Sequence, residues 1–292
     1  MPTGRDRKRR VYANRLNELT GKDWIKFTKS WFIHRPERRS DRKLLHPASY
    51  PESLVREFIQ FFTRPGQIVV DPFLGTGSTL IAAVGAGRSG VGFEIVPKYA
   101  KISQRRLKDS LVENHAPEDF KNRRKLFADV VSADSIMMSK IWHEKRLPPA
   151  DYCITSPPYW NQLKRNSIRQ KTRVERGLDT KYSSDPREIG NTAGYQEFLH
   201  SLKLHMDEVH KIMKPNGYLT VITNNVFADG RMHPLAFDTV STLSQSPFAW
   251  TPKDEKIWCQ DDKRLLPLGV YNAWVGNRHH QYCLIFRKEQ AN

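Results

Sequence analysis

The chain has 292 residues, of which 38% are hydrophobic and 27% are charged, and its formal net charge is +17 at pH 7. Its 7 Trp, 10 Tyr and 14 Phe are spread along the whole length, which excludes a disordered protein and leaves room for one large domain or two small ones. No apolar run approaches the ~20 residues of a membrane span, and no apolar stretch follows the basic N-terminus as in a secretory signal. The three cysteines suit neither a disulfide framework nor a zinc site. We therefore expect a cytoplasmic protein without a metal site.

The positive charge is concentrated in two segments. Residues 1–43 hold 14 Lys or Arg against 5 Asp or Glu, and residues 161–189 hold 8 against 4. Such local excess favours a polyanionic partner, most often nucleic acid, because released counterions drive that binding. The alternative is a merely solvated basic surface.

Residues 1–43 are predicted to form a basic N-terminal extension. Trp24, Phe27 and Trp31 recur at helical spacing, which indicates an apolar stripe. We expect this stripe to pack on the rest of the protein as a docked arm, in preference to serving as a platform for stacked bases.

From residue 44 onward the pattern alternates between helices and strands. Such alternation predicts a parallel sheet. The expected elements of the first half are a helix over 51–62, a strand over 67–71, a helix over 79–86, a strand over 90–93, a helix through 99–107, a surface loop over 112–125 and a strand over 127–133.

The second half continues the pattern after one long polar stretch. Residues 161–193 lack a regular apolar period, so we interpret them as a basic insertion within a catalytic domain that spans 44–292. The other expected elements are a strand over 152–155, a helix over 195–213, a turn over 214–217, a strand over 218–223, a helix over 235–245 and strands over 257–259 and 281–287.

The first chemical motif is a glycine-rich turn between a strand and a helix, from Asp71 to Thr79. Its glycines allow a tight turn and close approach to a ligand, yet it has neither the third glycine of a dinucleotide fingerprint nor the lysine of a P-loop. Glu94 and Asp134 end the next two strands, at the edge of the sheet where open α/β folds bind ligands. A carboxylate at Glu94 can accept both hydroxyls of a ribose. The pattern predicts a nucleoside ligand, against the alternative of a plain tight turn.

The second motif is Ser156-Pro157-Pro158-Tyr159, which follows a buried strand. Two prolines stiffen the loop and leave carbonyl groups to accept hydrogen bonds from an external donor, while Tyr159 offers a face for stacking. Such an arrangement suits the amino group of a flipped-out base. The alternative is a structural Pro-Pro turn.

Together the two motifs resemble the S-adenosylmethionine-dependent methyltransferases that act on exocyclic amines of nucleic acids. His46-Pro-Ala and the strand near Asn277-Arg278-His279 resemble further family segments. The resemblance implies a Rossmann-like α/β fold with a seven-stranded, mostly parallel sheet, an antiparallel C-terminal strand and helices on both faces. Ser-Pro-Pro-Tyr is more typical of cytosine-N4 methylation, and Asp-Pro-Pro-Tyr of adenine-N6 methylation.

The resulting hypothesis is a DNA (cytosine-N4-) methyltransferase of restriction-modification type that uses S-adenosyl-L-methionine and flips its target base out of duplex DNA. Expected catalytic residues are Ser156, Pro157, Pro158 and Tyr159. Expected cofactor-binding residues are His46, Pro47, Asp71, Pro72, Phe73, Gly75, Gly77, Ser78, Thr79, Glu94 and Asp134. Expected nucleic-acid contacts are Trp160, Lys164, Arg165, Arg169, Lys171 and Arg173.

Three questions remain open at this stage. The substrate could be RNA, such as ribosomal cytidine, or DNA adenine, and a nucleic-acid-binding protein without activity is a further alternative. Target recognition is expected from 161–193, from 1–43 or from the loop 225–234. Cys153, inside a buried strand, is expected to be a core residue without a catalytic role.

Overall fold

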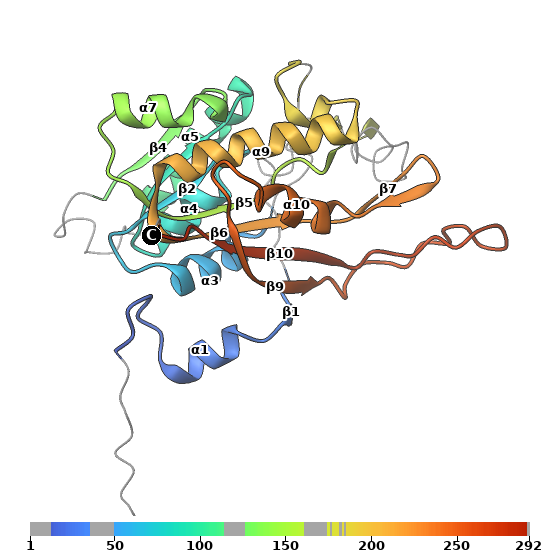
Figure 1. Cartoon of the computed structure of the whole chain (residues 1–292), viewed down its shortest axis with the longest axis horizontal. Coiled ribbons are helices and arrows are strands. Elements are labelled where there is room, and N and C mark those ends of the chain that lie inside the picture. The colour runs from blue at the N-terminus through green and yellow to red at the C-terminus, as the bar shows by residue number, and fades with distance from the viewer. Residues whose placement is uncertain are drawn as a thin grey trace, which may run out of the picture.

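The computed structural model describes residues 13–35, 50–113, 126–160, 174–175, 177–180, 183 and 185–290. Its centre is an eight-stranded sheet with the order β1-β9-β10-β6-β5-β2-β3-β4 (Figure 1). Strand β10 runs antiparallel to both of its neighbours, and the other adjacent strands are parallel. The predicted fold class is therefore confirmed, but the predicted number of seven strands is wrong by one.

The strands of this sheet are β1 (Trp31–Ile33), β2 (Ile68–Asp71), β3 (Ser89–Phe93), β4 (Ala128–Val131), β5 (Ala150–Thr155), β6 (Met213–Thr223), β9 (Thr251–Cys259) and β10 (His280–Arg287). A separate hairpin consists of β7 (Val226–Ala228) and β8 (Arg231–His233). The helices are α1 (Gly21–Phe27), α3 (Glu52–Phe62), α4 (Ser78–Gly85), α5 (Pro97–Glu113), α7 (Met138–Glu144), α9 (Tyr195–Ile212) and α10 (Leu235–Leu243), with 3-10 turns η1 (Ser135–Met137) and η3 (Ile189–Asn191).

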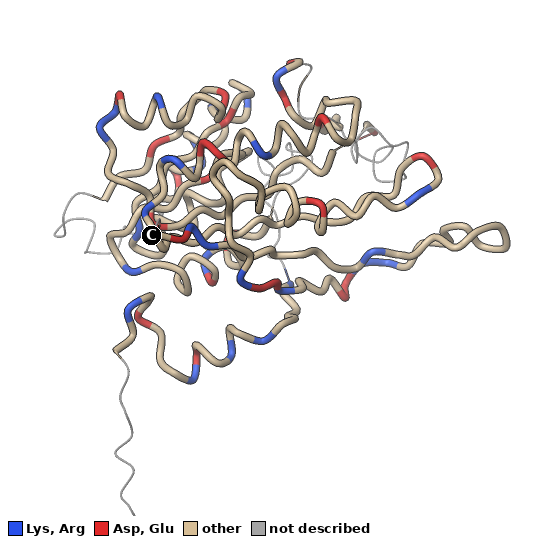
Figure 2. Tube along the Cα trace, viewed as in Figure 1, with Lys and Arg blue, Asp and Glu red and all other residues tan. Residues whose placement is uncertain are grey.

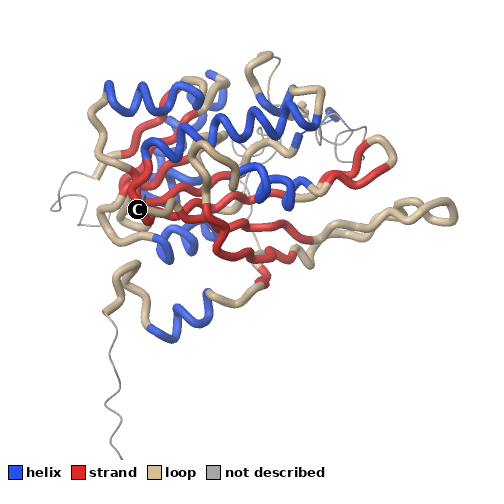
Figure 3. The backbone as a smooth tube through the Cα atoms, viewed as in Figure 1, coloured by secondary structure: helices blue, strands red, loops and turns tan. Residues whose placement is uncertain are grey.

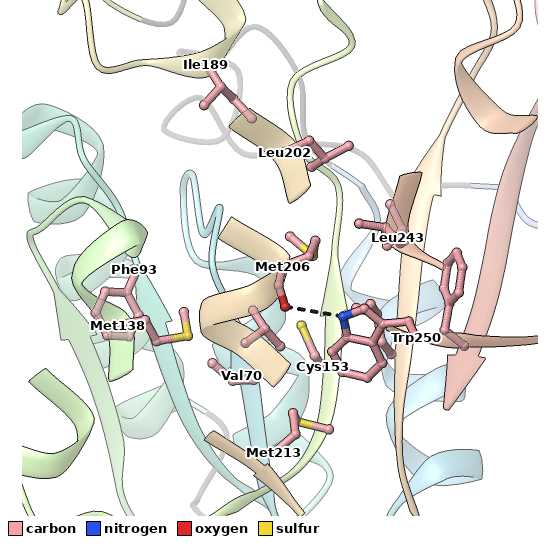
Figure 4. Close-up of a cluster of buried hydrophobic side chains, with 14 of the residues drawn as sticks. Val70, Phe93, Met138, Cys153, Ile189, Leu202, Met206, Met213, Leu243 and Trp250 are labelled. Atoms are coloured by element: carbon pink, nitrogen blue, oxygen red, sulfur yellow. Dashed lines mark hydrogen bonds between the residues drawn. The ribbon is translucent and has the colours of Figure 1, made fainter. Parts of the chain in front are cut away.

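Helices cover both faces of the sheet because the central strands are apolar on both sides (Figures 1 and 3). Along β2, Val69 points into the core under α3 and Val70 into the core under α7, α9 and α10. Figure 4 shows the second of these cores, where the Trp250 indole donates a hydrogen bond to the Met206 carbonyl at 3.2 Å. Cys153 is fully buried in the same cluster, as expected for a core residue.

The N-terminal segment is docked on the body. Trp24 and Phe27 pack against Phe61 of α3, with ring centroids 4.8 and 4.1 Å apart, so the interpretation as a docked arm is confirmed for these two aromatics. Trp31 does not continue their helix. It lies in β1, opposite Ile257 of β9, and its side chain is 47% exposed.

Strand β1 is the eighth strand, and tertiary pairing accounts for it. The free edge of β9 offers unpaired backbone groups, and Ile257 N donates to the Ser30 carbonyl at 2.8 Å. The strand has only three residues, which are all apolar and too few to show a strand's period of two in the sequence. The helical spacing therefore wrongly placed Trp31 on one stripe with Trp24 and Phe27.

The predicted turn at 214–217 is part of strand β6. The strand begins directly after α9, and Asn216 adopts a φ of 65° there. Backbone hydrogen bonds link Asn216 and Gly217 to Lys288, so this stretch is paired across the sheet despite its turn-like sequence. Helix α7, strand β1 and the β7–β8 hairpin are the elements that the sequence analysis did not foresee.

No helix among the described residues is long and apolar enough to cross a membrane. The predicted surface loop over 112–125 falls almost wholly outside the described residues.

Candidate active site

The glycine-rich turn forms as predicted between β2 and α4. Gly75 and Gly77 have φ angles of 57° and 89°, a region that favours glycine because other residues meet steric conflict there. A Cβ atom on Gly77 would lie 2.4 Å from the Ser103 hydroxyl oxygen, so α5 also requires glycine at this position. The turn therefore brings its backbone close to the sheet edge.

Asp71 lies behind the turn and holds it. Its carboxylate accepts hydrogen bonds from the hydroxyls of Tyr50, Thr79 and Thr155 and from the Phe73 backbone N–H. The side chain is fully buried, and burial raises its pKa although these hydrogen bonds act in the opposite direction. Asp71 thus ties together α4, β5 and the segment before α3.

Glu94 faces a cavity at the carboxyl end of β3. Its two oxygens accept from the backbone N–H groups of Gly75 and Val96, both at 2.8 Å. Burial is the main cause that raises the pKa of Glu94 from 4.5 to about 8, and the negative charges of Glu188 and Asp71 add to it. The carboxylate consequently titrates near neutral pH.

Asp134 lies on the same cavity, at the end of the chain segment that follows β4. It caps η1 by accepting from Ile136 N at 3.0 Å, and it lies 3.8 Å from the His205 Nδ1 atom. His205 is buried and hydrogen-bonds the Ser135 hydroxyl at 2.8 Å, and burial lowers its pKa, so the imidazole is neutral at pH 7.

The structure brings eight of the predicted residues to this one cavity. Those that line it are Pro72, Phe73, Gly75, Ser78, Glu94, Asp134, Ser156 and Pro158. Asp71, Gly77, Thr79, Pro157 and Tyr159 are described but do not line it. His46, Pro47, Lys164, Arg165, Arg169, Lys171 and Arg173 lie outside the described residues.

Several lining residues escaped the sequence analysis. Arg187, Glu188 and Ile189 come from the end of the basic insertion and lie against the cavity, while Tyr50 and His205 come from distant elements. Glu188 is buried, and burial raises its pKa. No local motif marks these positions, because only the packing of α9 and of the insertion brings them to the sheet edge.

The cavity's chemistry fits a nucleoside that carries positive charge. Three carboxylates line it, Glu94, Asp134 and Glu188, against one guanidinium. Thr76 Oγ1 and Ser78 Oγ are buried there and have no hydrogen-bond partner among the described residues. Buried polar atoms of this kind are normally paired, so these two hydroxyls are available to a bound ligand.

The Ser156-Pro157-Pro158-Tyr159 loop leaves β5 at the same edge. The Tyr159 hydroxyl donates to Gln281 Oε1 at 2.8 Å and lies 3.2 Å from Ser156 Oγ. Burial raises the pKa of Tyr159 well above its ordinary value, so the phenol stays protonated. The loop is thereby fixed to the first residues of β10.

Trp160 differs from expectation. Predicted as a nucleic-acid contact, it is only 5% exposed and packs against the rings of Tyr195 and His233, with centroids 5.0 and 4.7 Å away. It belongs to the buried core behind the loop and presents no open face, and its backbone has a positive φ of 44°.

Comparisons with known proteins point to one family. Residues 3–105 match the model of a DNA methylase family, and this match includes the glycine-rich turn and Glu94. The match covers about a third of the chain; it supports the predicted resemblance to this family and the predicted cofactor, S-adenosyl-L-methionine, but it does not distinguish cytosine-N4 from adenine-N6 methylation.

Individual relatives match over short stretches. The chain is 38% identical over 77 residues to DNA adenine methyltransferase YhdJ of Escherichia coli, which is 26% of each protein. It is 37% identical over 94 residues to type II methyltransferase M.HinfI of Haemophilus influenzae, which is 32% of this chain and 23% of that protein. The matches span about a quarter of the length of these curated relatives. Among solved structures, TrmN from Thermus thermophilus aligns with 81% of this chain and 48% of its own, at 11% identity and a TM-score of 0.45.

Proposed function

We propose that the chain is a DNA methyltransferase that modifies the exocyclic N4 amine of cytosine with S-adenosyl-L-methionine as methyl donor. One observation carries the proposal: the glycine-rich turn, Glu94 and the Ser156-Pro157-Pro158 loop open onto the same cavity. A donor pocket and an acceptor loop are thus side by side, as direct group transfer requires.

The cofactor pocket has a role for each polar group. Glu94 is placed to accept the hydroxyls of a ribose, and the acidic groups of the cavity favour a cationic ligand more strongly as Glu94 ionises above its pKa of about 8. The unpaired hydroxyls of Thr76 and Ser78 offer two further hydrogen bonds. When bound, S-adenosyl-L-methionine supplies an electrophilic methyl group on a sulfonium.

The acceptor side rests on the direction of a short hydrogen-bond chain. Tyr159 gives its proton to Gln281, so its oxygen can accept the Ser156 hydroxyl proton. Ser156 Oγ then has its lone pairs free. They can accept a hydrogen of the target amine, which concentrates electron density on the amine nitrogen as it becomes pyramidal.

Two other groups complete this side. The Pro157 carbonyl can accept the second amine hydrogen, and the Tyr159 ring is oriented by its hydroxyl bond for stacking on the base. After transfer, the cationic amine loses its proton to solvent. Orientation of the reacting groups can contribute about 7–11 kcal/mol to such a reaction.

Adenine N6 is the second candidate acceptor. The relative YhdJ is named a DNA adenine methyltransferase, which favours adenine, whereas Ser156 at the start of the Pro-Pro motif favours cytosine. Duplex DNA is the proposed substrate, with the target base flipped, because a paired base cannot present its amine to a stiff loop at the sheet edge.

The test is identification of the modified nucleoside. The full chain is incubated with methyl-labelled S-adenosyl-L-methionine and either unmethylated genomic DNA or total RNA, and the digested nucleosides are analysed by mass. We expect labelled N4-methylcytosine from DNA, loss of label with Ser156→Ala, and no change with Ser244→Ala at the end of α10. Label only on adenine, or only in RNA, contradicts the proposed acceptor.

A further inference from the structure

A long narrow loop projects from the carboxyl edge of the sheet. Residues 260–279, here called the finger, leave the end of β9 and return to the start of β10. Figures 1 and 3 show the finger extending far beyond the strands, in the same direction as the β7–β8 hairpin. Each of its arms has about ten residues, so the finger can reach at most ~35 Å.

Specific hydrogen bonds hold its two arms together. Gln260 N donates to the His279 carbonyl at 2.7 Å near the base. Further out, the Asn277 side chain accepts from Leu266 N at 2.9 Å and donates to the Leu266 carbonyl at 2.8 Å. The Asn277 side chain thus makes the two hydrogen bonds that a backbone would make in a pair of strands. The finger is therefore a two-stranded ribbon without the regular backbone hydrogen bonds of a sheet.

The outer half of the finger is apolar and exposed. Trp274 is 95% exposed, Tyr271 is fully exposed and Leu265 is 78% exposed. Residues 265–277 contain no Lys, Arg, Asp or Glu. Figure 2 shows the same division, with charges confined to the base of the finger. Large aromatic side chains in full contact with water are costly unless they serve binding.

The base of the finger carries charges of both signs and continues into β10, which contacts the proposed catalytic loop. Lys263, Arg264 and Arg278 lie there beside Asp261 and Asp262, and Arg35 pairs with Asp261 at 3.3 Å. Tyr159 donates to Gln281, and Asn224 donates to the His280 carbonyl at 2.7 Å. A nucleic acid whose base enters the Ser156 loop would therefore pass beside the finger.

We infer that the finger is a duplex-DNA contact element whose tip aromatics, Trp274 and Tyr271, stack on or wedge between bases. The inference rests on the proposed function for its choice of DNA. The major groove, ~12 Å wide, admits a two-stranded ribbon, and apolar side chains are known to enter base steps and unstack them. The gap left by a flipped base is one place that an aromatic side chain can fill.

A second copy of the chain is the other possible partner for exposed aromatics. Stable protein interfaces bury ~800 Å² on each partner, with some 20–30 residues a side. The finger is a slender projection whose base holds three Lys or Arg against two Asp, so its shape suits the groove of a duplex better than a broad protein surface.

The test compares duplex binding by matched variants of the full chain. Fluorescence anisotropy measures the Kd for a labelled 30-bp duplex of mixed sequence, and calorimetry measures the Kd for S-adenosyl-L-methionine. We expect Trp274→Ala to weaken duplex binding on the order of tenfold, equivalent to about 1.4 kcal/mol. Trp274→Phe should restore most of the affinity.

A second pair of variants controls for backbone strain and for general loss of an aromatic. Tyr271 and Phe248 both have positive φ angles, 64° and 60°, and Phe248 lies at the opposite edge of the sheet, just before β9 begins. Asparagine tolerates this backbone region. Tyr271→Asn should weaken duplex binding, Phe248→Asn should not, and cofactor affinity should stay unchanged in all of these variants.

The outcomes separate the finger from the proposed function. Unchanged duplex affinity in both Trp274→Ala and Tyr271→Asn overturns the inference. It is also overturned if sedimentation shows that the wild-type chain is a dimer and these variants are monomers with the same affinity for DNA. If no nucleoside is labelled while Trp274→Ala still weakens duplex binding, the finger assignment holds and the proposed activity falls.

Discussion

The cofactor cavity and the finger lie at the same edge of the sheet but are built in opposite ways. Around the cavity, the carboxylates are buried and paired: Asp71 accepts four hydrogen bonds, and Glu94 accepts two from the backbone. On the finger, large apolar side chains stand in solvent. The first region is largely hydrogen-bonded within the protein and leaves the hydroxyls of Thr76 and Ser78 for a ligand, whereas the second gains its contacts only from a partner.

The two regions also differ in what their ligands would require. The family model matches residues 3–105, which contain the turn and Glu94 but neither the finger nor the cavity residues Asp134 and Ser156. A small ligand of fixed shape requires particular residues at particular places. A surface for a long polymer can be built from many sequences, because any aromatic can stack and any cation can meet a phosphate.

The largest effect is expected for the carboxylate that holds the cavity together. Asp71→Ala removes the acceptor of three buried hydroxyls and of the part-buried Phe73 N–H, and each buried group left unpaired costs ~1–3 kcal/mol. We expect the free energy of unfolding in urea to fall by about 3–5 kcal/mol. Asp129→Ala on β4 is the matched control. It removes an ion pair with Lys145 at 3.0 Å whose side chains are 39% and 44% exposed, so it should cost at most ~1 kcal/mol.

Equal destabilisation by the two aspartate variants would show that Asp71 is not a structural centre. The cavity would then be shaped by its ligand, and the contrast with the finger would disappear.

The next effect concerns cofactor affinity. Glu94→Ala removes charge-assisted hydrogen bonds to the ligand, so at pH 9 the binding free energy should weaken by about 1.5–3 kcal/mol. Calorimetry with the folded variant checks this, and Glu144→Ala, on the exposed surface of α7, should bind as the wild type does. Unchanged affinity in Glu94→Ala would remove the ribose assignment.

The pKa of Glu94 predicts how this affinity depends on pH. The carboxyl titrates at about 8 in the folded protein because it is buried, so it is mostly protonated at pH 7 and ionised at pH 9. Cofactor binding that needs the ionised form should tighten about tenfold between these values. Glu94→Gln should lose this part of the pH dependence. Identical pH profiles of cofactor affinity for the wild type and Glu94→Gln would contradict the prediction.

The raised pKa of Glu94 also predicts how the free energy of unfolding depends on pH. Because the folded pKa lies above the ordinary value of 4.5, the folded state holds more protons than the unfolded state between these pH values. The contribution of Glu94 to the unfolding free energy therefore falls as pH rises from about 4.5 to about 8.

The cavity side of the fold could be predicted from the sequence in some detail. Strand-helix alternation indicated the parallel sheet, and acids at strand ends indicated Glu94 and Asp134, because these features are local in the chain. Asp71 was correctly placed at the turn, but its role differs from the predicted ligand contact. Only the three-dimensional structure reveals that Tyr50 and Thr155 occupy its oxygens.

Features that depend on distant pairing could not be predicted. Strand β1 exists because β9 has a free edge, and His205 and Glu188 reach the cavity through the packing of α9 and of the insertion. The finger has no apolar period, and its arms are joined by the Asn277 side chain and by a backbone hydrogen bond between Gln260 and His279. Exposed aromatics in such a segment do not differ in sequence from aromatics that fill a core, as Trp160 shows.

The smallest expected effect lies at the junction of the two regions, at Gln281. Its side-chain oxygen accepts the Tyr159 proton, and this sets the direction of the chain that leaves the Ser156 lone pairs free. Gln281→Leu removes the acceptor. Since one such hydrogen bond is worth ~0.5–1.5 kcal/mol, kcat should fall by about three- to tenfold. Cofactor affinity should not change, because Gln281 does not line the cavity.

Two further variants separate this directional role from simple packing. Gln281→Glu keeps an acceptor and should retain turnover, whereas Gln281→Lys offers only donors and should lower kcat at least as much as Gln281→Leu. Gln245→Leu, exposed after α10, controls for the loss of an amide. If all three changes at Gln281 lower kcat equally, Gln281 acts by shape alone. The start of β10 would then position the loop without orienting its hydrogen bonds, and Ser156 would need another explanation for its free lone pairs.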